Sequence, residues 1–306
     1  MAASRPKIYF FACIAVALWG LSFLWTNQLL EYNVPVFTLV CTRMVVAGFI
    51  LFTFGVLFKK LQCLHKEDVK WVLLMAFMEP FLYFIGETFG MKLTASPNIS
   101  SVIVSSIPIF ALLGGIFFFK EKPSLLNMVG ILVTLPGLCL VVFGKWGLTS
   151  AASFDTPSST LWAGIALLFL AVFSAVGYAI IVKKISAKYN AYTITTWQMS
   201  LGALYFLPFM CFIDLPGSPL IGFISDIQFW KPIFMLSILC SCVAFVLFIT
   251  VIKELGVSRA NIFDALIPIV TLAACLLMGV ETITWWQGIG VVIVVCGVIL
   301  AQWKKA

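Results

Sequence analysis

Ten long apolar segments dominate this sequence, and each is long enough for a helix to cross a lipid bilayer, which takes about 20 residues. To within a few residues the segments are 8–30, 36–58, 71–91, 98–119, 126–143, 160–182, 192–213, 231–252, 258–279 and 285–303. Phenylalanine and leucine lie on all their faces, which favours helices over the alternating strands of a membrane barrel. The sequence therefore predicts an all-α membrane protein with ten transmembrane helices.

The composition excludes several other classes of protein. Apolar residues make up 62% of the chain and charged residues 10%, whereas soluble proteins have about 45–50% and about 25%. Because so little polar surface cannot cover a chain in water, we exclude a soluble globular protein, a disordered chain, a coiled coil and a nucleic-acid binder. The nine cysteines are odd in number and all but Cys63 lie in apolar runs, so we expect reduced thiols.

The basic residues predict the orientation of the helices. With the N-terminus in the cytoplasm, fifteen lysines and arginines fall on the inner side and three on the outer side. This bias follows the positive-inside rule and places both termini in the cytoplasm. The net charge of +7 is therefore a sign of topology, and it does not indicate a nucleic-acid partner.

The chain partly matches itself when it is shifted by 160 residues. The aligned pairs are Pro108 with Pro268, Ile109 with Ile269, Glu121 with Glu281, Gly130 with Gly290, and Gly137 with Gly297. Since each half holds five segments, the second copy has to lie upside down. We predict two inverted five-helix repeats at 1–145 and 160–306, joined by an outer linker at 146–159, an architecture found in secondary transporters.

Short motifs occur in order along both halves. The first half carries Leu18-Trp19-Gly20 with Ser22-Phe23, Thr42-Arg43 with Ala47, Leu93-Thr94-Ala95-Ser96 and Pro108. The second half carries Leu255-Gly256-Val257-Ser258-Arg259-Ala260, Pro268, Glu281 with Thr284 and Gln287, then Gly290 and Gly297. This ordered set resembles the EamA-type family of the drug/metabolite transporter (DMT) superfamily over nearly the whole chain. It departs at Lys120-Glu121-Lys122-Pro123, where a glycine usually precedes the glutamate.

The resemblance implies ten helices, a central cavity and the movement of small organic metabolites, such as amino acids or related amphipathic compounds, commonly outward. It also implies that the protein is located in the cell inner (cytoplasmic) membrane. We therefore expect a secondary transporter (permease or exporter) that works by alternating access, with a small-molecule substrate and the lipid bilayer as partners. Protons are a candidate coupling ion, and facilitated diffusion is equally allowed. A channel and a receptor-type scaffold are the alternatives, and the sequence does not determine the oligomeric state.

Four ionisable residues fall at membrane depth, where charge is costly and usually functional: Arg43, Glu79, Glu87 and Asp264. Glu79 lies near the bilayer middle on a polar stripe with Tyr83, Gly86, Glu87 and Gly90, and we expect it to bind substrate or protons, with structural pairing as the alternative. Arg43 could pair with Glu79 or Glu87, as a gate or as a static ion pair, or it could extend to the outer headgroups. Glu87 lies near the outer edge, where we expect a structural or gating role. Asp264 is either a coupling residue or a carboxylate bonded to backbone near a helix start.

Polar and aromatic side chains share faces of the other predicted helices and suit an amphipathic ligand. The cavity candidates on these faces are Trp19, Ser22, Thr26, Ser101, Ser105, Tyr178, Trp197 and Asn261. Interhelical packing is the alternative for each of them. Pro108 and Pro268 remove helical hydrogen bonds, so we expect them to bend their two helices and to allow movement.

The marks of an enzyme are missing from the sequence. His65 is the one histidine and lies among charged loop residues, so no histidine pair can bind a metal. The HExxH, GxSxG and P-loop motifs are absent as well. We predict no enzymatic activity, no catalytic residue, no metal and no cofactor.

Overall fold

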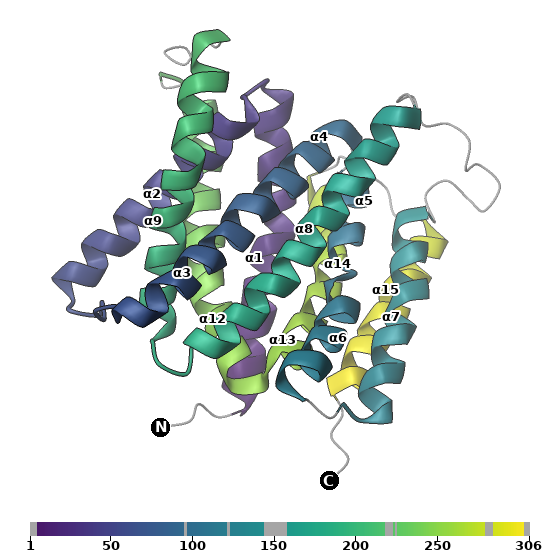
Figure 1. The fold of residues 1–306 in the computed structure, drawn as a ribbon. Coiled ribbons are helices and arrows are strands. Elements are labelled where there is room, and N and C mark those ends of the chain that lie inside the picture. Colours follow the sequence, from purple (N-terminus) through teal and green to yellow (C-terminus); the bar gives the residue numbers. More distant parts are fainter. Residues whose placement is uncertain are drawn as a thin grey trace.

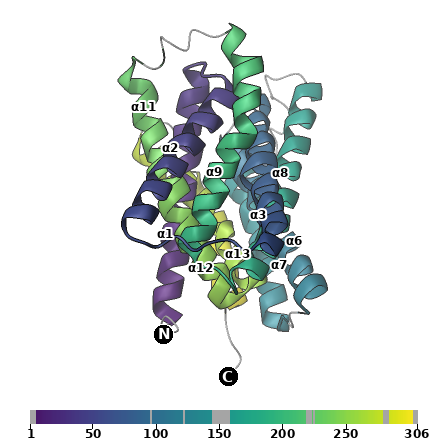
Figure 2. The same cartoon turned by 60° about the vertical axis from the view of Figure 1, so that its left-hand side comes forward.

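A computed structural model describes residues 5–94, 97–120, 123–143, 158–217, 223, 225–278 and 284–302, and the regular elements within these ranges are all helices. The helices lie side by side in a tilted bundle (Figures 1 and 2). The predicted all-α membrane fold is thus confirmed at this level. Most of the predicted linker at 146–159, together with Glu121 and Glu281, lies outside the described residues, while Ser158 already begins a helix.

The α-helices of the first half are α1 (Arg5–Glu31), α2 (Val36–Leu57), α3 (Val69–Ala76), α4 (Gly90–Thr94), α5 (Pro97–Val104), α6 (Ile107–Phe119) and α7 (Leu125–Phe143). Those of the second half are α8 (Ser158–Ile185), α9 (Ala191–Phe209), α11 (Ile227–Phe234), α12 (Phe245–Leu255), α13 (Val257–Asn261), α14 (Ile267–Leu277) and α15 (Trp285–Gln302). Turns of π-helix or 3₁₀-helix join them at η1 (Lys66–Asp68), η2 (Phe77–Leu82), η3 (Ile85–Phe89), η4 (Met210–Asp214), η5 (Leu215–Gly217), η6 (Met235–Ala244) and η7 (Ile262–Leu266).

Seven helical stretches in the described part of the chain are long and apolar enough to cross a membrane. They are Pro6–Glu31, Val36–Leu57, Lys66–Thr94, Ser159–Ile185, Ala191–Asp214, Ile227–Leu255 and Val257–Leu277. Shorter apolar helices cover Ile107–Phe119, Leu125–Gly137 and Gly288–Ala301. All ten stretches fall on the ten predicted segments, and the fourth segment is divided between α5 and α6.

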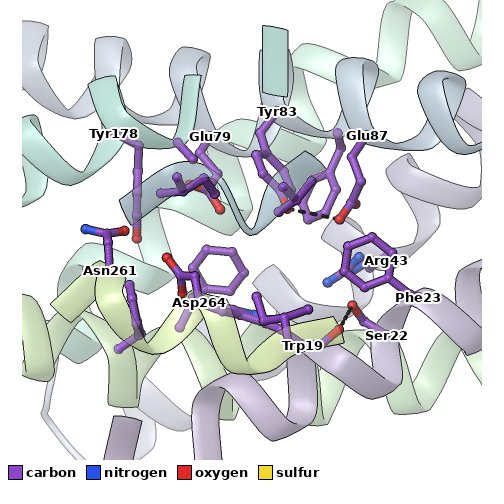
Figure 3. Close-up of a pocket in the computed structure, with 17 residues that line it drawn as sticks. Trp19, Ser22, Phe23, Arg43, Glu79, Tyr83, Glu87, Tyr178, Asn261 and Asp264 are labelled. Carbon is purple, nitrogen blue, oxygen red and sulfur yellow. Dashed lines mark hydrogen bonds between the residues drawn. The ribbon is translucent and has the colours of Figure 1, made fainter. Parts of the chain in front are cut away.

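The third span bends sharply at Glu79, a feature that we did not predict. Glu79 has extended backbone angles (φ −144°, ψ 116°) within the π-helical turn η2, which follows α3 and precedes η3. The following residue, Pro80, has no backbone N–H and disfavours a helical conformation in the residue before it. The bend turns Glu79 toward the centre of the bundle (Figure 3).

The two predicted proline bends take the form of interruptions. α6 begins at Ile107 and α14 at Ile267, so Pro108 and Pro268 both lie in the first turn of a new helix. Proline fits there because the first turn needs no intrahelical N–H donor. The interruptions touch each other, since Ser105 Oγ donates to the backbone oxygens of Ser101 (2.7 Å) and Asp264 (3.1 Å).

Glycines bring α7 and α15 into close antiparallel contact, and Figure 1 shows this pair at the right-hand edge of the bundle. A Cβ atom built on Gly297 would lie 2.9 Å from the backbone oxygen of Gly130, and one on Gly137 would lie 3.0 Å from that of Gly290. Small residues allow such close approach of helices in membranes. The backbone contacts leave no room for a larger side chain at these positions.

The turns at the two ends of the bundle are held by polar contacts. At one end, Lys188 Nζ donates to Asp68 at 2.8 Å, and this carboxylate raises the pKa of Lys188. At the other end, the Asp226 carboxylate accepts hydrogen bonds from the Tyr32 hydroxyl and, at 2.9 Å, from the backbone N–H of Gln228. These hydrogen bonds lower the pKa of Asp226, and the aspartate caps the start of α11.

The glycine contact predicts a selective loss of stability. Gly297→Leu should lower the melting temperature of the detergent-solubilised protein, at a cost of about 1–3 kcal/mol from overpacking. Gly288, on the same helix, has no atom within 4 Å of a built Cβ, so Gly288→Leu is the matched control and should melt like the parent. Equal melting temperatures for the two variants would contradict the packing described.

Candidate functional site

A buried cavity lies where the bent third span meets α1, α2, α8, α12 and the interrupted helices (Figure 3). Its lining residues are Trp19, Ser22, Phe23, Arg43, Glu79, Tyr83, Phe84, Glu87, Val104, Ile107, Ala175, Tyr178, Phe245, Phe248, Asn261, Asp264 and Ile267. The volume of the cavity that the centre of a water molecule can occupy is about 40 Å³. This volume is enough for a few water molecules. In this conformation the cavity can enclose a small polar group but not a large ligand.

The residues of the polar stripe predicted on the third span have two different surroundings, the cavity and the helix α8. Glu79, Tyr83 and Glu87 line the cavity, and the Tyr83 hydroxyl donates to Glu87 Oε1 at 3.0 Å. The glycines of the same stripe, Gly86 and Gly90, instead pack against α8. The close approach of this span to α8 therefore depends on the glycines, while the acids face inward.

Arg43 is buried on the cavity wall, with 2% of its surface exposed. Its Nε donates to Ser241 Oγ at 2.7 Å, and its guanidinium carbon lies 4.4 Å from the centre of the Phe84 ring. Figure 3 places the guanidinium on the Glu87 side of the cavity. A direct ion pair between Arg43 and either glutamate stays a prediction, because Ser241 is the hydrogen-bond partner in this conformation.

Asp264 faces Glu79 across the cavity (Figure 3). Only 2% of Asp264 and 6% of Glu79 are exposed, and the Oδ1 atom of Asp264 has no hydrogen-bond partner in the part of the chain that the structure describes. Asn261, on the same wall, donates from Nδ2 to the backbone oxygen of Val257 at 2.8 Å. A buried carboxylate oxygen without a partner is costly, so this end of the cavity is suited to receive a donor or a cation.

The structure brings together some of the predicted polar and aromatic residues at this cavity. Trp19, Ser22, Tyr178 and Asn261 line it along with the charged groups. The indole of Trp19 donates to the backbone oxygen of Cys240 at 3.3 Å, and the Tyr178 hydroxyl donates to Gln198 Oε1 at 3.1 Å. Both rings are therefore held in place by hydrogen bonds.

Four other candidates lie elsewhere. Thr26 and Ser101 are buried but do not line the cavity, and Ser105 bonds to backbone oxygens at the interruption of its helix. Trp197 is 38% exposed and lines a separate surface groove beside Phe52. Its neighbour Gln198 points inward to Tyr178, because successive residues of a helix point about 100° apart.

Much of the cavity wall is apolar and was missed by the sequence reasoning. The wall is lined by four phenylalanines: Phe23, Phe84, Phe245 and Phe248. The ring centre of Trp19 lies 5.2 Å from that of Phe245 and 4.7 Å from that of Phe248. A phenylalanine on an apolar membrane helix carries no signal that separates a cavity wall from a lipid-facing surface. Only Phe23 was marked, as part of the Ser22-Phe23 motif.

The sequence of this chain is similar to a known protein family. The EamA-like transporter family matches residues 6–143 and again 162–303. The chain belongs to the EamA-like transporter family. For this EamA-family protein, membership indicates membrane transport and not enzymatic catalysis. The described residues contain no group of three or more histidine, cysteine, aspartate or glutamate side chains that could hold a metal ion.

Two relatives and one solved structure each match nearly the whole chain. The uncharacterized transporter YetK of Bacillus subtilis (strain 168) is 25% identical over 295 residues, covering 95% of this chain and 85% of YetK. An uncharacterized transporter of Archaeoglobus fulgidus is 23% identical over 299 residues, covering 98% of this chain and 100% of the relative. A crystal structure with a TM-score of 0.77 and 16% identity covers 98% of this chain and 97% of its own, so it shares the fold.

The Arg43 contact predicts different effects for two buried serines of η6. Ser241→Ala removes the acceptor of Arg43 Nε and should destabilise the protein by about 1–3 kcal/mol, because a buried cationic donor loses its partner. Ser237 is equally buried, but its hydroxyl has no hydrogen-bond partner within the described ranges, so Ser237→Ala should leave the melting temperature unchanged or higher. Thermal unfolding in detergent measures both, and a similar loss in the two variants would refute the assignment.

Proposed function

We propose that this EamA-family protein is a secondary transporter of small organic metabolites, such as amino acids or related amphipathic compounds, that works by alternating access. The observation that carries the proposal is the buried cavity in which Arg43, Glu79, Glu87 and Asp264 meet aromatic side chains. Charged groups inside a membrane bundle are retained mainly where they handle a substrate or an ion. In the proposal, Glu79 binds substrate or protons, and Arg43 with Glu87 balances charge and gates.

The proposed architecture is ten transmembrane helices in two inverted repeats, residues 1–145 and 160–306. Two cavity-lining pairs support it, since Val104 aligns with Asp264 and Ile107 with Ile267 under the 160-residue shift. The contact of α7 with α15 supports it as well. Shifting the pair Gly130 and Gly297 by one repeat produces the pair Gly290 and Gly137, which is also in contact. Contacts that exchange in this way are expected around a pseudo-twofold axis between the halves.

Two open spaces at the ends of α1 support access from both sides. A pocket of about 310 Å³ is lined by Asn127, Lys183, Arg259 and Ile262 among others. The ring centre of Phe263, the neighbour of Ile262, lies 5.9 Å from that of Tyr9 near the start of α1, with the two rings tilted by 39°. A second pocket of about 520 Å³ is lined by Trp25 and Gln28 near the end of α1. The cavity residues Trp19 and Ser22 lie between these positions on the same helix. Alternating access would connect the cavity to one pocket at a time.

The interrupted helices are the proposed moving parts. In broken membrane helices, the free backbone groups face a cavity or protein, and the segments on each side can tilt independently. Ser105 and Asp264 join the two interruptions through one hydrogen bond. In the proposal, binding at the Asp264 side therefore changes the contact between α5 and η7, and Pro108 and Pro268 define where the helices resume.

Transport itself is tested by counterflow. Purified protein in proteoliposomes should show saturable counterflow of at least one member of a panel of labelled amino acids, amines and nucleosides. Glu79→Gln should reduce the rate about tenfold or more, because a charge-assisted contact is lost, while Glu67→Gln, in the exposed turn η1, should not. Unsaturable flux with single-channel conductance would indicate that the protein is a channel and not a carrier. A rate in Glu79→Gln equal to the parent's would remove this residue from the mechanism.

The proposed location is the cell inner membrane with both termini cytoplasmic. It places Cys63, in an exposed turn beside His65, on the cytoplasmic side and Gln228 on the outer side. A variant that keeps Cys63 alone among the nine cysteines should react with a membrane-impermeant maleimide in inverted vesicles but not in intact cells. Gln228→Cys in a cysteine-free background should show the opposite pattern. The reverse result for both positions would invert the topology.

A further inference from the structure

We propose that the cavity selects an organic amine in its protonated form and that Glu79 and Asp264 bind the ammonium group. The amine carries an apolar or aromatic substituent and no carboxylate. This inference names the substrate class of the site and rests on the proposed function.

The charge of the lining residues is the first argument. Three carboxylates and one guanidinium line the cavity, so it carries a net charge of −2 when all four groups are ionised. An uncompensated charge inside a protein that is surrounded by hydrocarbon is strongly unfavourable. A positively charged ligand would remove part of this cost, whereas an anionic ligand would add to it.

The charges are divided between two ends of the cavity. Arg43 lies at one end, bonded to Ser241 and beside Glu87, which accepts a hydrogen bond from Tyr83. Glu79 and Asp264 face each other at the other end (Figure 3). The cation of the cavity thus lies with Glu87, and the unbalanced negative charge lies with the Glu79 and Asp264 pair.

The carboxylate oxygen without a hydrogen-bond partner lies at the same end of the cavity. Asp264 is 2% exposed and its Oδ1 atom has no partner among the described residues. An ammonium group offers three N–H donors and a positive charge, and its hydrogen bonds to carboxylates are among the strongest in proteins. One ammonium between the two acids would supply a donor to Asp264 and a counter-charge to Glu79.

The remaining wall suits the rest of such a ligand. Trp19 packs edge-on against Phe245 and Phe248, and Tyr178 lies 6.2 Å from Phe245. Aromatic faces attract cations and also cover apolar groups. The present space of about 40 Å³ accepts the ammonium head, and the substituent enters when the side chains of the cavity separate.

The same arrangement disfavours a zwitterion. Arg43 lies at the far end of the cavity beside Glu87, where its Nε donates to Ser241 and its guanidinium carbon lies over the Phe84 ring, and so it is away from a carboxylate attached next to the ammonium group. A substrate carboxylate next to the ammonium would lie close to Glu79 and Asp264, where like charges repel. We therefore expect an amine to bind at least tenfold more tightly than the amino acid with the same side chain.

Thermal shift of the purified full-length protein in detergent tests the inference at neutral pH. The probes are 2-phenylethylamine, L-phenylalanine and 3-phenylpropionate, which share one ring and differ in charge, with butylamine as a second amine. Both amines should raise the melting temperature in a concentration-dependent way, L-phenylalanine should do so at least tenfold more weakly, and the anion should have no effect. Ligands that bind only the folded state stabilise it by mass action.

Variants locate the binding group. Asp264→Asn and Glu79→Gln should each weaken the amine shift at least tenfold, Asp264→Glu should keep most of it, and the exposed-turn variant Glu67→Gln should keep all of it. Size-exclusion profiles and ligand-free melting temperatures show whether each variant is folded. Because Asp264→Asn and Glu79→Gln lie on different helices, misfolding of one leaves the other as a test.

Several results would overturn the proposal. L-phenylalanine binding as tightly as the amine would assign the site to zwitterions. The absence of a shift with either amine would reject amine binding, and an unchanged shift in both neutralised variants would show that Glu79 and Asp264 are not the ammonium site. Counterflow of amino acids without amine binding would reject this inference and retain the transporter, whereas amine binding without counterflow of any compound would reject the transporter and retain the site.

Discussion

The hydrocarbon around a membrane protein forces every backbone N–H and C=O group to find a partner inside the protein. Continuous helices meet this condition, and a helix can be interrupted only where protein or a cavity receives the freed groups. In this chain the interruptions at Glu79, between α5 and α6, and at η7 all converge on one buried cavity. The position of the candidate site is therefore a consequence of where the backbone can leave the helical conformation.

The same low-polarity environment makes the cavity electrostatically asymmetric. Val104 and Asp264 occupy matched positions of the two halves and both line the cavity, yet only one is charged. The third span adds Glu79 and Glu87, and α2 adds Arg43. Positions that match under the 160-residue shift thus carry different charges, which distinguishes one end of the site from the other and provides a basis for choosing a substrate.

Close backbone contacts at glycines connect this site to the rest of the bundle. Gly86 and Gly90 place the third span against α8, while Glu79 and Glu87 of the same span line the cavity. Gly130, Gly137 and Gly297 join α7 to α15 away from the cavity, where the two halves meet again. The close contacts between α7 and α15 thus lie apart from the charged cavity, which lies among the interrupted helices.

Hydropathy along the chain was sufficient to predict the ten apolar segments, the helical class and the four buried charges, because length and polarity are local properties. It also indicated Trp19, Ser22, Tyr83, Tyr178 and Asn261, whose polar atoms stand out in apolar helices. The bend at Glu79, the Ser241 partner of Arg43 and the phenylalanine wall depend on neighbours far away in the chain. Trp197 and Thr26 show the same limit, since periodicity defines a helix face but only packing decides what that face meets.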